Sequence, residues 1–196
     1  MMKSDDRFVG GHAILDFVNT VKDQEKSRNL SVFNDFSSFL QWSNDASIFN
    51  EDEVNALVKL DDTLEGEALA RIHLVREMLY SYFVDLIPPH TGSCIMSPVI
   101  ELKIKNAIQN SELVKSERGY HWAADLNSEY WFINKIFLLT EEFLRTCDLT
   151  KLRQCGRCSW LFLNNGRGNG RKWCKMSTCG NRAKSTAFRK RSIDTD

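Results

Sequence analysis

The sequence predicts a mainly α-helical protein with one small β-hairpin, followed by a short C-terminal module that contains four cysteines. Apolar residues recur every three or four positions through most of the first 150 residues, which is the period of a helix with one buried face. Asn, Asp and Ser residues that can begin a helix precede several of these runs. The cysteines and a basic tail follow, so we expect two domains, residues 1–150 and residues 151–196.

The first part of the helical domain contains three predicted helices. Residues 8–23 carry apolar side chains at helical spacing, and a short helix is expected from about Asn34. Asn50 followed by Glu53 matches a capping box, in which each residue bonds to the backbone N–H of the other. The helix that follows should bury Val54, Leu57 and Val58.

The remaining elements of this domain have clear start and stop signals. Asp62 followed by Glu65 should begin the longest helix, which Pro88-Pro89 ends. Proline after Ser97 favours another helix start, because the first turn does not need that N–H. A β-hairpin is expected around residues 117–119, and a last helix over about residues 128–147.

Asp16, Asn19 and Arg76 are polar residues on otherwise apolar helices. They are candidates for a pocket that binds a small effector, since such pockets combine apolar walls with a few polar groups. The alternative is structural, in which these side chains cap the helices and tie them to their neighbours. The sequence leaves both interpretations open.

Four cysteines near the C-terminus have metal-ligand spacing. Cys155, Cys158, Cys174 and Cys179 form the pattern C-x2-C-x15-C-x4-C. Two close pairs about fifteen residues apart can surround one tetrahedral zinc ion. Disulfides or ordinary buried thiols are the alternative, but the surrounding residues are mostly polar or basic. We therefore predict one Zn²⁺ per chain, in a closed four-thiolate site with no open position for catalytic water, and expect no enzyme activity.

The rest of the module should form a hairpin and a helix. Residues 160–163 and residues 171–173 are expected to pair as strands, and Ser177 is expected to cap a final helix that carries Cys179 in its first turn. A knuckle, a hairpin and a ligand-bearing helix together resemble a treble-clef zinc finger.

The final helix is strongly basic and is the predicted contact with DNA. Arg and Asn can bond in pairs to guanine and adenine edges, while Lys and Arg suit phosphates. A solvated surface is the alternative for the whole helix, and Asn181 and Arg182 could instead brace the knuckle. The candidate DNA-binding residues are Arg171, Lys172, Asn181, Arg182, Lys184, Ser185, Arg189, Lys190 and Arg191.

A net charge of zero hides a strong asymmetry. Residues 151–196 contain 12 Lys and Arg against 2 Asp, whereas residues 1–150 contain 14 basic and 24 acidic residues. A basic module of this kind suits a polyanion. In the alternative interpretation, the acidic domain of the same chain docks the basic tail. The N-terminus has no apolar signal segment and no stretch reaches the length of a membrane span, so we expect a cytoplasmic protein without membrane contact.

Two groups of residues carry a family resemblance. Trp173-Cys174, Met176 and Cys179-Gly180-Asn181-Arg182, followed by a basic helix, resemble the CGNR zinc finger. Residues 15–20 (LDFVNT) and 75–83 (VREMLYSYF) resemble the helical ABATE domain that precedes this finger. Asn164 and Asn165, where an acidic residue is expected, and Lys172 in place of arginine depart from the family pattern, but none is a zinc ligand.

The resemblance implies a stress-induced transcription regulator of bacteria. We therefore expect the finger to bind duplex DNA, and the helical domain to sense an effector, to form a homodimer, or both. The rival interpretation is a module without sequence specificity, which grips RNA or an acidic partner protein with the same finger.

Overall fold

The chain divides into two compact units. Along the sequence, one unit is inserted between the two segments of the other. The computed structural model describes residues 7–23, 26–60, 62–88, 96–117, 119–166 and 170–193. One unit, called here the helical unit, comprises residues 33–149. The other, the finger unit, combines residues 1–32 with residues 150–196. The expected boundary near residue 150 matches the second junction, whereas the first 32 residues group with the finger.

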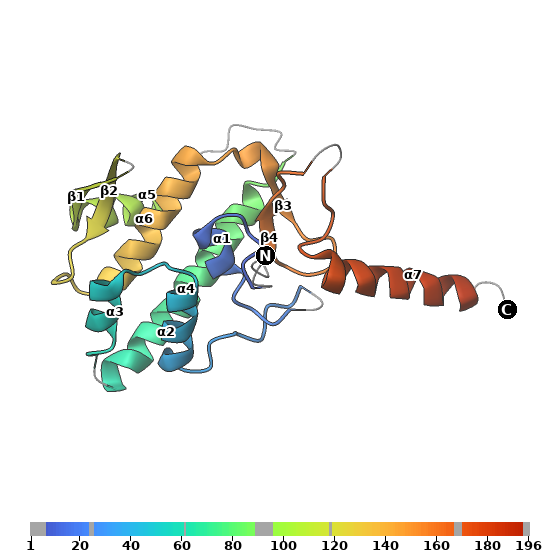
Figure 1. The fold of residues 1–196 in the computed structure, drawn as a ribbon, viewed down its shortest axis with the longest axis horizontal. Helices are drawn as coiled ribbons and strands as arrows, with labels where there is room; N and C mark the ends of the chain where they lie inside the picture. The colour runs from blue at the N-terminus through green and yellow to red at the C-terminus, as the bar shows by residue number, and fades with distance from the viewer. Residues whose placement is uncertain are drawn as a thin grey trace. The chain divides into compact units, whose positions relative to one another are not determined.

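Most of the helical unit consists of five helices and one hairpin (Figure 1). In chain order its elements are α2 (Phe36–Asp45), α3 (Glu51–Leu57), α4 (Asp62–Asp85), α5 (Pro98–Gln109), β1 (Ser111–Ser116), β2 (Gly119–Ala124) and α6 (Trp131–Thr146), and the 3-10 turn η1 (Leu149–Lys151) follows at the junction. The mainly α-helical class with one small hairpin is therefore confirmed.

The helix starts follow the sequence signals. The Asn50 side chain accepts from the backbone N–H of Glu53 at 2.9 Å, and the Glu53 carboxylate accepts from the backbone N–H of Asn50 at 2.8 Å. This reciprocal pair is the predicted capping box of α3. Asp35 and Ser38 form a second one at the start of α2, and Pro98 is the first residue of α5.

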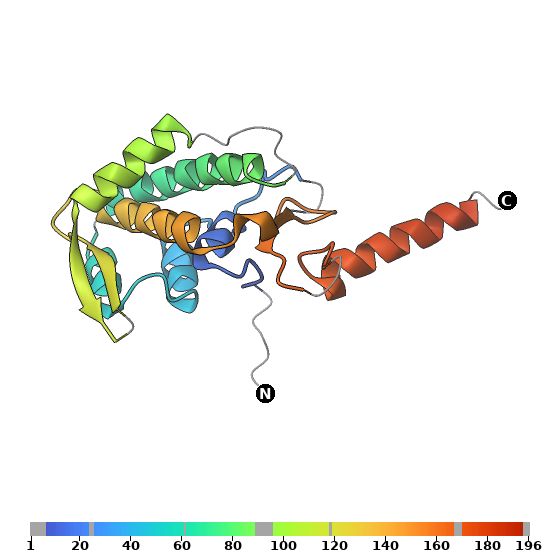
Figure 2. The same ribbon diagram turned by 90° about the horizontal axis from the view of Figure 1, so that it is seen from above.

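The core of the helical unit lies among α4, α5 and α6, which run alongside one another (Figure 2). The expected stripe on α4 is buried at Ile72, Leu79 and Phe83. The rings of Phe83 and Phe143 meet edge to face, with centroids 5.2 Å apart. One expectation is wrong: Val58, the C-cap that follows α3, is 61% exposed, whereas Leu57, the last residue of the helix, is buried.

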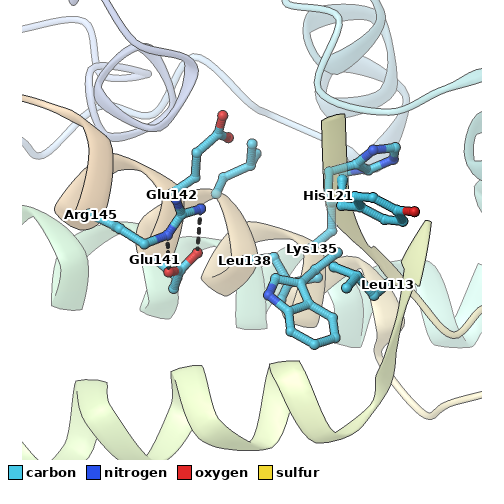
Figure 3. Close-up of a pocket in the computed structure, with 10 residues that line it drawn as sticks. Leu113, His121, Lys135, Leu138, Glu141, Glu142 and Arg145 are labelled. Carbon is cyan, nitrogen blue, oxygen red and sulfur yellow. Dashed lines mark hydrogen bonds and ion pairs between the residues drawn. The ribbon is translucent and has the colours of Figure 1, made fainter. Parts of the chain in front are cut away.

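Strands β1 and β2 pair antiparallel from Ser111 opposite Ala124 to Ser116 opposite Gly119, which confirms the predicted hairpin. The hairpin packs on α5 and α6. A cavity of about 260 Å³ lies between it and α6, with Leu113 and Leu138 in its lining and Arg145 paired with Glu141 (Figure 3). Its lining mixes both signs of charge with apolar side chains.

The finger unit differs more from expectation. Its helix α1 covers only Ala13–Val18 and not residues 8–23, because the chain turns at Asn19 and Val21 forms an isolated bridge with Ser31. Strands β3 (Leu152–Gln154) and β4 (Leu161–Leu163) pair antiparallel. The expected pairing of residues 160–163 with residues 171–173 is therefore wrong.

The C-terminal helix of the finger unit also begins differently from the prediction. A wide turn with π-helical bonds, η2 (Met176–Gly180), precedes α7 (Asn181–Ile193). Ser177 lies inside η2 and does not cap a helix; the residue before η2 is Lys175, which makes no side-chain cap. Among the described residues, no helix combines the length and the apolar character that a membrane crossing requires.

The ion pair between Lys135 and Glu53 joins α6 to α3 inside the helical unit and provides a test of this packing. The Lys135 ammonium lies 2.8 Å from the carboxylate, and both side chains are largely buried. Replacing Lys135 by Ala leaves a buried charge without its partner, so we expect a loss of about 3 kcal/mol of unfolding free energy. Urea denaturation followed by circular dichroism measures it.

Lys105 is the matched control, because its pair with Glu101 has similar length but is exposed. Replacing Lys105 by Ala should cost less than about 1 kcal/mol. Equal effects of the two substitutions would contradict the buried role of Lys135.

Candidate metal centre and nucleic-acid interface

The four predicted ligands converge from three parts of the finger unit. Cys155 and Cys158 belong to the turn that joins β3 to β4, which is closed by a bond from the Cys155 N–H to the Trp160 carbonyl at 2.8 Å. Cys174 follows the loop after β4, and Cys179 lies in η2. All four side chains are buried, and their sulfur atoms lie within 4.8 Å of one another.

The spacing of the sulfur atoms fits one zinc ion. The Sγ atoms of Cys158, Cys174 and Cys179 are separated by 3.6 to 3.7 Å. A tetrahedron with zinc–sulfur bonds of about 2.3 Å has sulfur atoms about 3.8 Å apart. A disulfide would require about 2.05 Å, and the structure has all four cysteines as free thiols. The disulfide alternative is therefore excluded.

The charge of this cluster also calls for a cation. Its hydrogen bond with Cys155, together with burial, raises the pKa of Cys158 to about 12. Hydrogen bonds with Cys155 and Cys158 raise the pKa of Cys174, and the bonds from these two thiols lower the pKa of Cys155. Four buried thiols this close cannot all ionise by themselves, because each thiolate would repel the others. Zn²⁺ removes that repulsion and binds the deprotonated sulfurs. The finger thus holds one Zn²⁺.

Close packing fixes the two halves of the cluster against each other. Phe162, Trp160 and Trp173 pack around the cysteines. The Gly156 N–H donates to the Lys172 carbonyl at 3.0 Å, and a Cβ at Gly156 would lie 2.8 Å from the Trp173 ring. Only glycine therefore allows this turn to approach the segment that carries Cys174.

The N-terminal segment of the chain completes the finger. The Asn19 side chain bonds twice to the backbone of Leu161, donating to its carbonyl at 2.8 Å and accepting from its N–H at 2.7 Å. Leu163 donates its N–H to the Gly10 carbonyl. The Trp160 indole donates to the Val21 carbonyl at 3.0 Å. Strand β4 is thus bonded to β3 on one side and to the N-terminal segment on the other.

These contacts give Asp16 and Asn19 structural roles. Asp16 is buried and accepts from the Gly10 N–H at 2.7 Å. Burial raises the pKa of Asp16 to about 6. The backbone bonds from Gly10 and Val9 and the charge of Arg171 lower this pKa, but burial has the larger effect. Arg76 belongs to the helical unit, where its Nε donates to Glu77 at 2.8 Å. The polar atoms expected to face an effector are therefore engaged by the protein, which favours the structural alternative.

Arg171 and Lys172 lie in the loop before Cys174, away from α7 in the sequence. The Arg171 guanidinium donates to the carbonyls of Val9 and Cys174, at 2.6 and 3.2 Å, and stacks 4.1 Å from the centre of the Phe162 ring. Partial burial lowers its pKa. Arg171 therefore ties the N-terminal segment to the metal centre, a role that the sequence did not indicate. Lys172 is exposed, and its ammonium lies 5.3 Å from the Trp173 ring.

Helix α7 divides the other candidate contacts between two faces. Asn181, Arg182, Ser185 and Arg189 follow one another at spacings of one, three and four residues, which keeps them on one side. Lys184 and Arg191 lie about half a turn around the helix from Arg182, at about 100° per residue. All six side chains are exposed, whereas the side chain of Lys190 lies outside the described residues.

The first of these faces borders a groove of about 420 Å³, called here the arginine groove. Within the described part of the chain, its lining contains three arginines, one amide and four hydroxyl groups, and no acidic side chain. Asn181 also braces its own helix, since its Nδ2 donates to the Ser177 carbonyl at 3.1 Å. The lining residues are Arg157, Ser177, Thr178, Asn181, Arg182, Ser185, Thr186 and Arg189.

Sequence reasoning missed Arg157 as a member of this surface. It lies between Cys155 and Cys158, and the groove brings it to the helix that follows Cys179. The spacing of the cysteines contained this information. A metal ion bound by both cysteine pairs also brings the residues between Cys155 and Cys158 close to the residues that follow Cys179.

The metal centre predicts a selective unfolding. Replacing Cys158 by Ser should remove zinc and unfold the finger unit while the helical unit stays folded, because zinc supplies about 10–16 kcal/mol of apparent binding free energy in finger peptides. Metal analysis and Trp160 fluorescence measure the two effects. Replacing Cys147, a free cysteine outside the cluster, by Ser should keep one zinc per chain.

The bonds of Asn19 predict that the finger depends on the N-terminal segment. Replacing Asn19 by Ala leaves the buried N–H and carbonyl of Leu161 without partners, at a cost of about 3 kcal/mol in unfolding free energy. Zinc release at increasing denaturant reports the stability of the finger unit. Replacing the exposed Asn44 by Ala serves as control, and equal midpoints for the two variants would contradict the structural role of Asn19.

Comparison with known proteins agrees with this geometry. No curated protein matches the chain. Residues 151–192 match the family described as the CGNR zinc finger, and this segment contains the four converging cysteines.

Proposed function

We propose that the finger unit binds duplex DNA through α7 and that the protein is a bacterial transcription regulator. The observation that carries this proposal is the arginine groove beside a metal-anchored helix, whose lining, as far as the structure describes the chain, contains three arginines and no acidic side chain. Arginine and asparagine are the side chains best suited to base edges and phosphates.

The dimensions of α7 support the same function. Its 13 residues extend for about 20 Å at about 1.5 Å each, and the major groove of DNA is about 12 Å wide. In this proposal, Asn181, Arg182 and Ser185, in the first half of α7, approach the bases. Arg189 is further along the same face and suits the phosphate backbone.

The helical unit supplies the regulatory input in this proposal, by sensing an effector or by forming a homodimer. It is inserted between the two segments of the finger unit, so the chain passes between the units at residue 33 and again at residue 149. Those two segments bond to each other through Asn19 and Leu161. In this proposal, a conformational change at the ends of the helical unit therefore acts on both segments of the finger unit.

Room for an effector exists within the helical unit itself. A cavity of about 360 Å³ lies among α4, α5 and α6, with Leu74, Met78 and Phe137 as apolar walls and Arg71 and Lys103 at its rim. Its size is that of a small-molecule site. This cavity replaces Asp16, Asn19 and Arg76 as the candidate effector site.

The remaining parts of the proposal rest on the sequence. The resemblance of the helical region to an ABATE domain supports the stress-response role and a cytoplasmic location. The four thiolates are occupied as zinc ligands, which supports a binding protein and not an enzyme.

Binding of the zinc-loaded full chain to random and selected duplexes, at about 50 to 300 mM salt, tests the function. We expect the affinity to fall steeply with salt, with a slope of about −0.9 per phosphate contacted. Replacing Arg182 by Ala should weaken binding to the selected site about tenfold, which is within the usual value of one base contact. Replacing Lys184 by Ala removes the same charge from the opposite face and should change the preference little.

A competition experiment distinguishes sequence-specific DNA binding from the rival interpretation, which is a module without sequence specificity. If structured RNA and heparin displace the protein from the selected duplex as effectively as that duplex itself, the finger is a polyelectrolyte binder without sequence preference. An Arg182→Ala protein that loses its zinc would reassign Arg182 to bracing the knuckle.

A further inference from the structure

Arg157 has an unusual position for a charged residue. It is the third residue of the Cys155–Cys158 turn, so the backbone on both sides of it is fixed by a zinc ligand. Its side chain is half-buried. Among the described residues, the Arg157 Nε is a buried side-chain nitrogen with no hydrogen-bond partner. A buried donor without a partner destabilises the protein, so an acceptor that reaches this nitrogen is favourable.

The other wall of the arginine groove offers matching donors. Arg182 and Arg189 belong to the face of α7 that borders the groove, together with Asn181. The hydroxyls of Ser185 and Thr186 donate back to carbonyls of their own helix, at 3.1 and 3.0 Å, and so do not neutralise the arginines. Among the described residues, three arginines therefore line one groove, and no acidic side chain belongs to its lining.

Such a lining selects for a phosphate group. Guanidinium presents planar pairs of N–H donors that match phosphate oxygens, and a bond of this kind is about twice as strong as one between neutral groups. Arg157 comes from the knuckle and the other two arginines come from the helix. A phosphate between them would touch both metal-bound halves of the finger.

We propose that Arg157, with Arg182 and Arg189, holds one backbone phosphodiester of the bound nucleic acid, so that the zinc knuckle positions the duplex along with the helix. This inference rests on the proposed function. It assigns Arg157 a role in positioning and not in reading sequence, because phosphate contacts carry no direct information about the bases.

The test compares four zinc-loaded full-length proteins: wild type, Arg157→Ala, Arg157→Lys and Lys184→Ala. Their affinities for a random duplex and for the selected duplex are measured across the same salt series. Arg157→Ala should weaken binding to both duplexes about tenfold and flatten the salt slope by about 0.9. Arg157→Lys should keep the slope, since the charge remains, and lose part of the affinity, since the planar fork is gone.

Zinc content and the thermal midpoint of each variant show whether the knuckle is intact. If Arg157→Ala loses zinc, Arg157→Lys still decides, because it retains the charge and the length of the side chain. The inference is overturned if Arg157→Ala keeps its zinc and changes the slope no more than Lys184→Ala does. Where Arg157→Ala loses its zinc, the inference is overturned if Arg157→Lys binds both duplexes as wild type does. In that case an Arg182→Ala protein that still loses affinity leaves the proposed function standing.

Competition with inorganic phosphate distinguishes two ligands that the groove could bind, a phosphodiester of nucleic acid and a free phosphate ion. If the groove takes a phosphodiester of nucleic acid, phosphate at about 10 mM should compete no better than sulfate at equal ionic strength, as screening alone predicts. Stabilisation of the finger by phosphate alone, lost in Arg157→Ala, would overturn the proposal in favour of a free phosphate site. If no variant and no salt change alters DNA binding, the proposed function itself fails.

Discussion

The finger unit depends on the balance of charge among four buried thiols. Three of the sulfur–sulfur separations are 3.6 to 3.7 Å, a distance at which thiolates without a cation repel one another strongly. Zinc cancels this repulsion, and its bonds to the four thiolates become the strongest interaction of the unit. The two short strands bury Leu152 and the three residues of β4, whereas the turn η2 buries only Cys179 and Gly180. The positions of Arg157 and of the first turn of α7 therefore follow from the metal.

Hydrogen bonds extend that constraint to a part of the chain far away in sequence. Strand β4 is three residues long, and its outer edge is closed by Asn19 and Gly10. Without those partners, buried backbone groups of Leu161 and Leu163 would remain unsatisfied. The segment that matches the CGNR family is thus shorter than the unit that folds around it, and residues 151–196 alone lack one wall of the finger.

Sequence reasoning succeeded where one local interaction decides the structure. The capping box at Asn50, the proline after Ser97 and the cysteine spacing are signals within short segments, and the starts of α3 and α5 and the metal centre were predicted from them. It failed where a partner lies far away. The pairing of β3 with β4 depends on the zinc turn between them, and the roles of Asn19 and Arg171 depend on contacts across about 140 and 160 residues.

The charge asymmetry of the sequence also acquires a different meaning in three dimensions. Twelve basic residues in the last 46 suggested one basic surface, yet Arg171 is engaged by carbonyls, and Lys184 and Arg191 lie on the side of α7 opposite to Arg182. Of the basic residues that the structure describes, Arg157, Arg182 and Arg189 share the arginine groove. Charge counts predict how strongly a polyanion is attracted at a distance, whereas the geometry of those three arginines decides where a phosphate can be held.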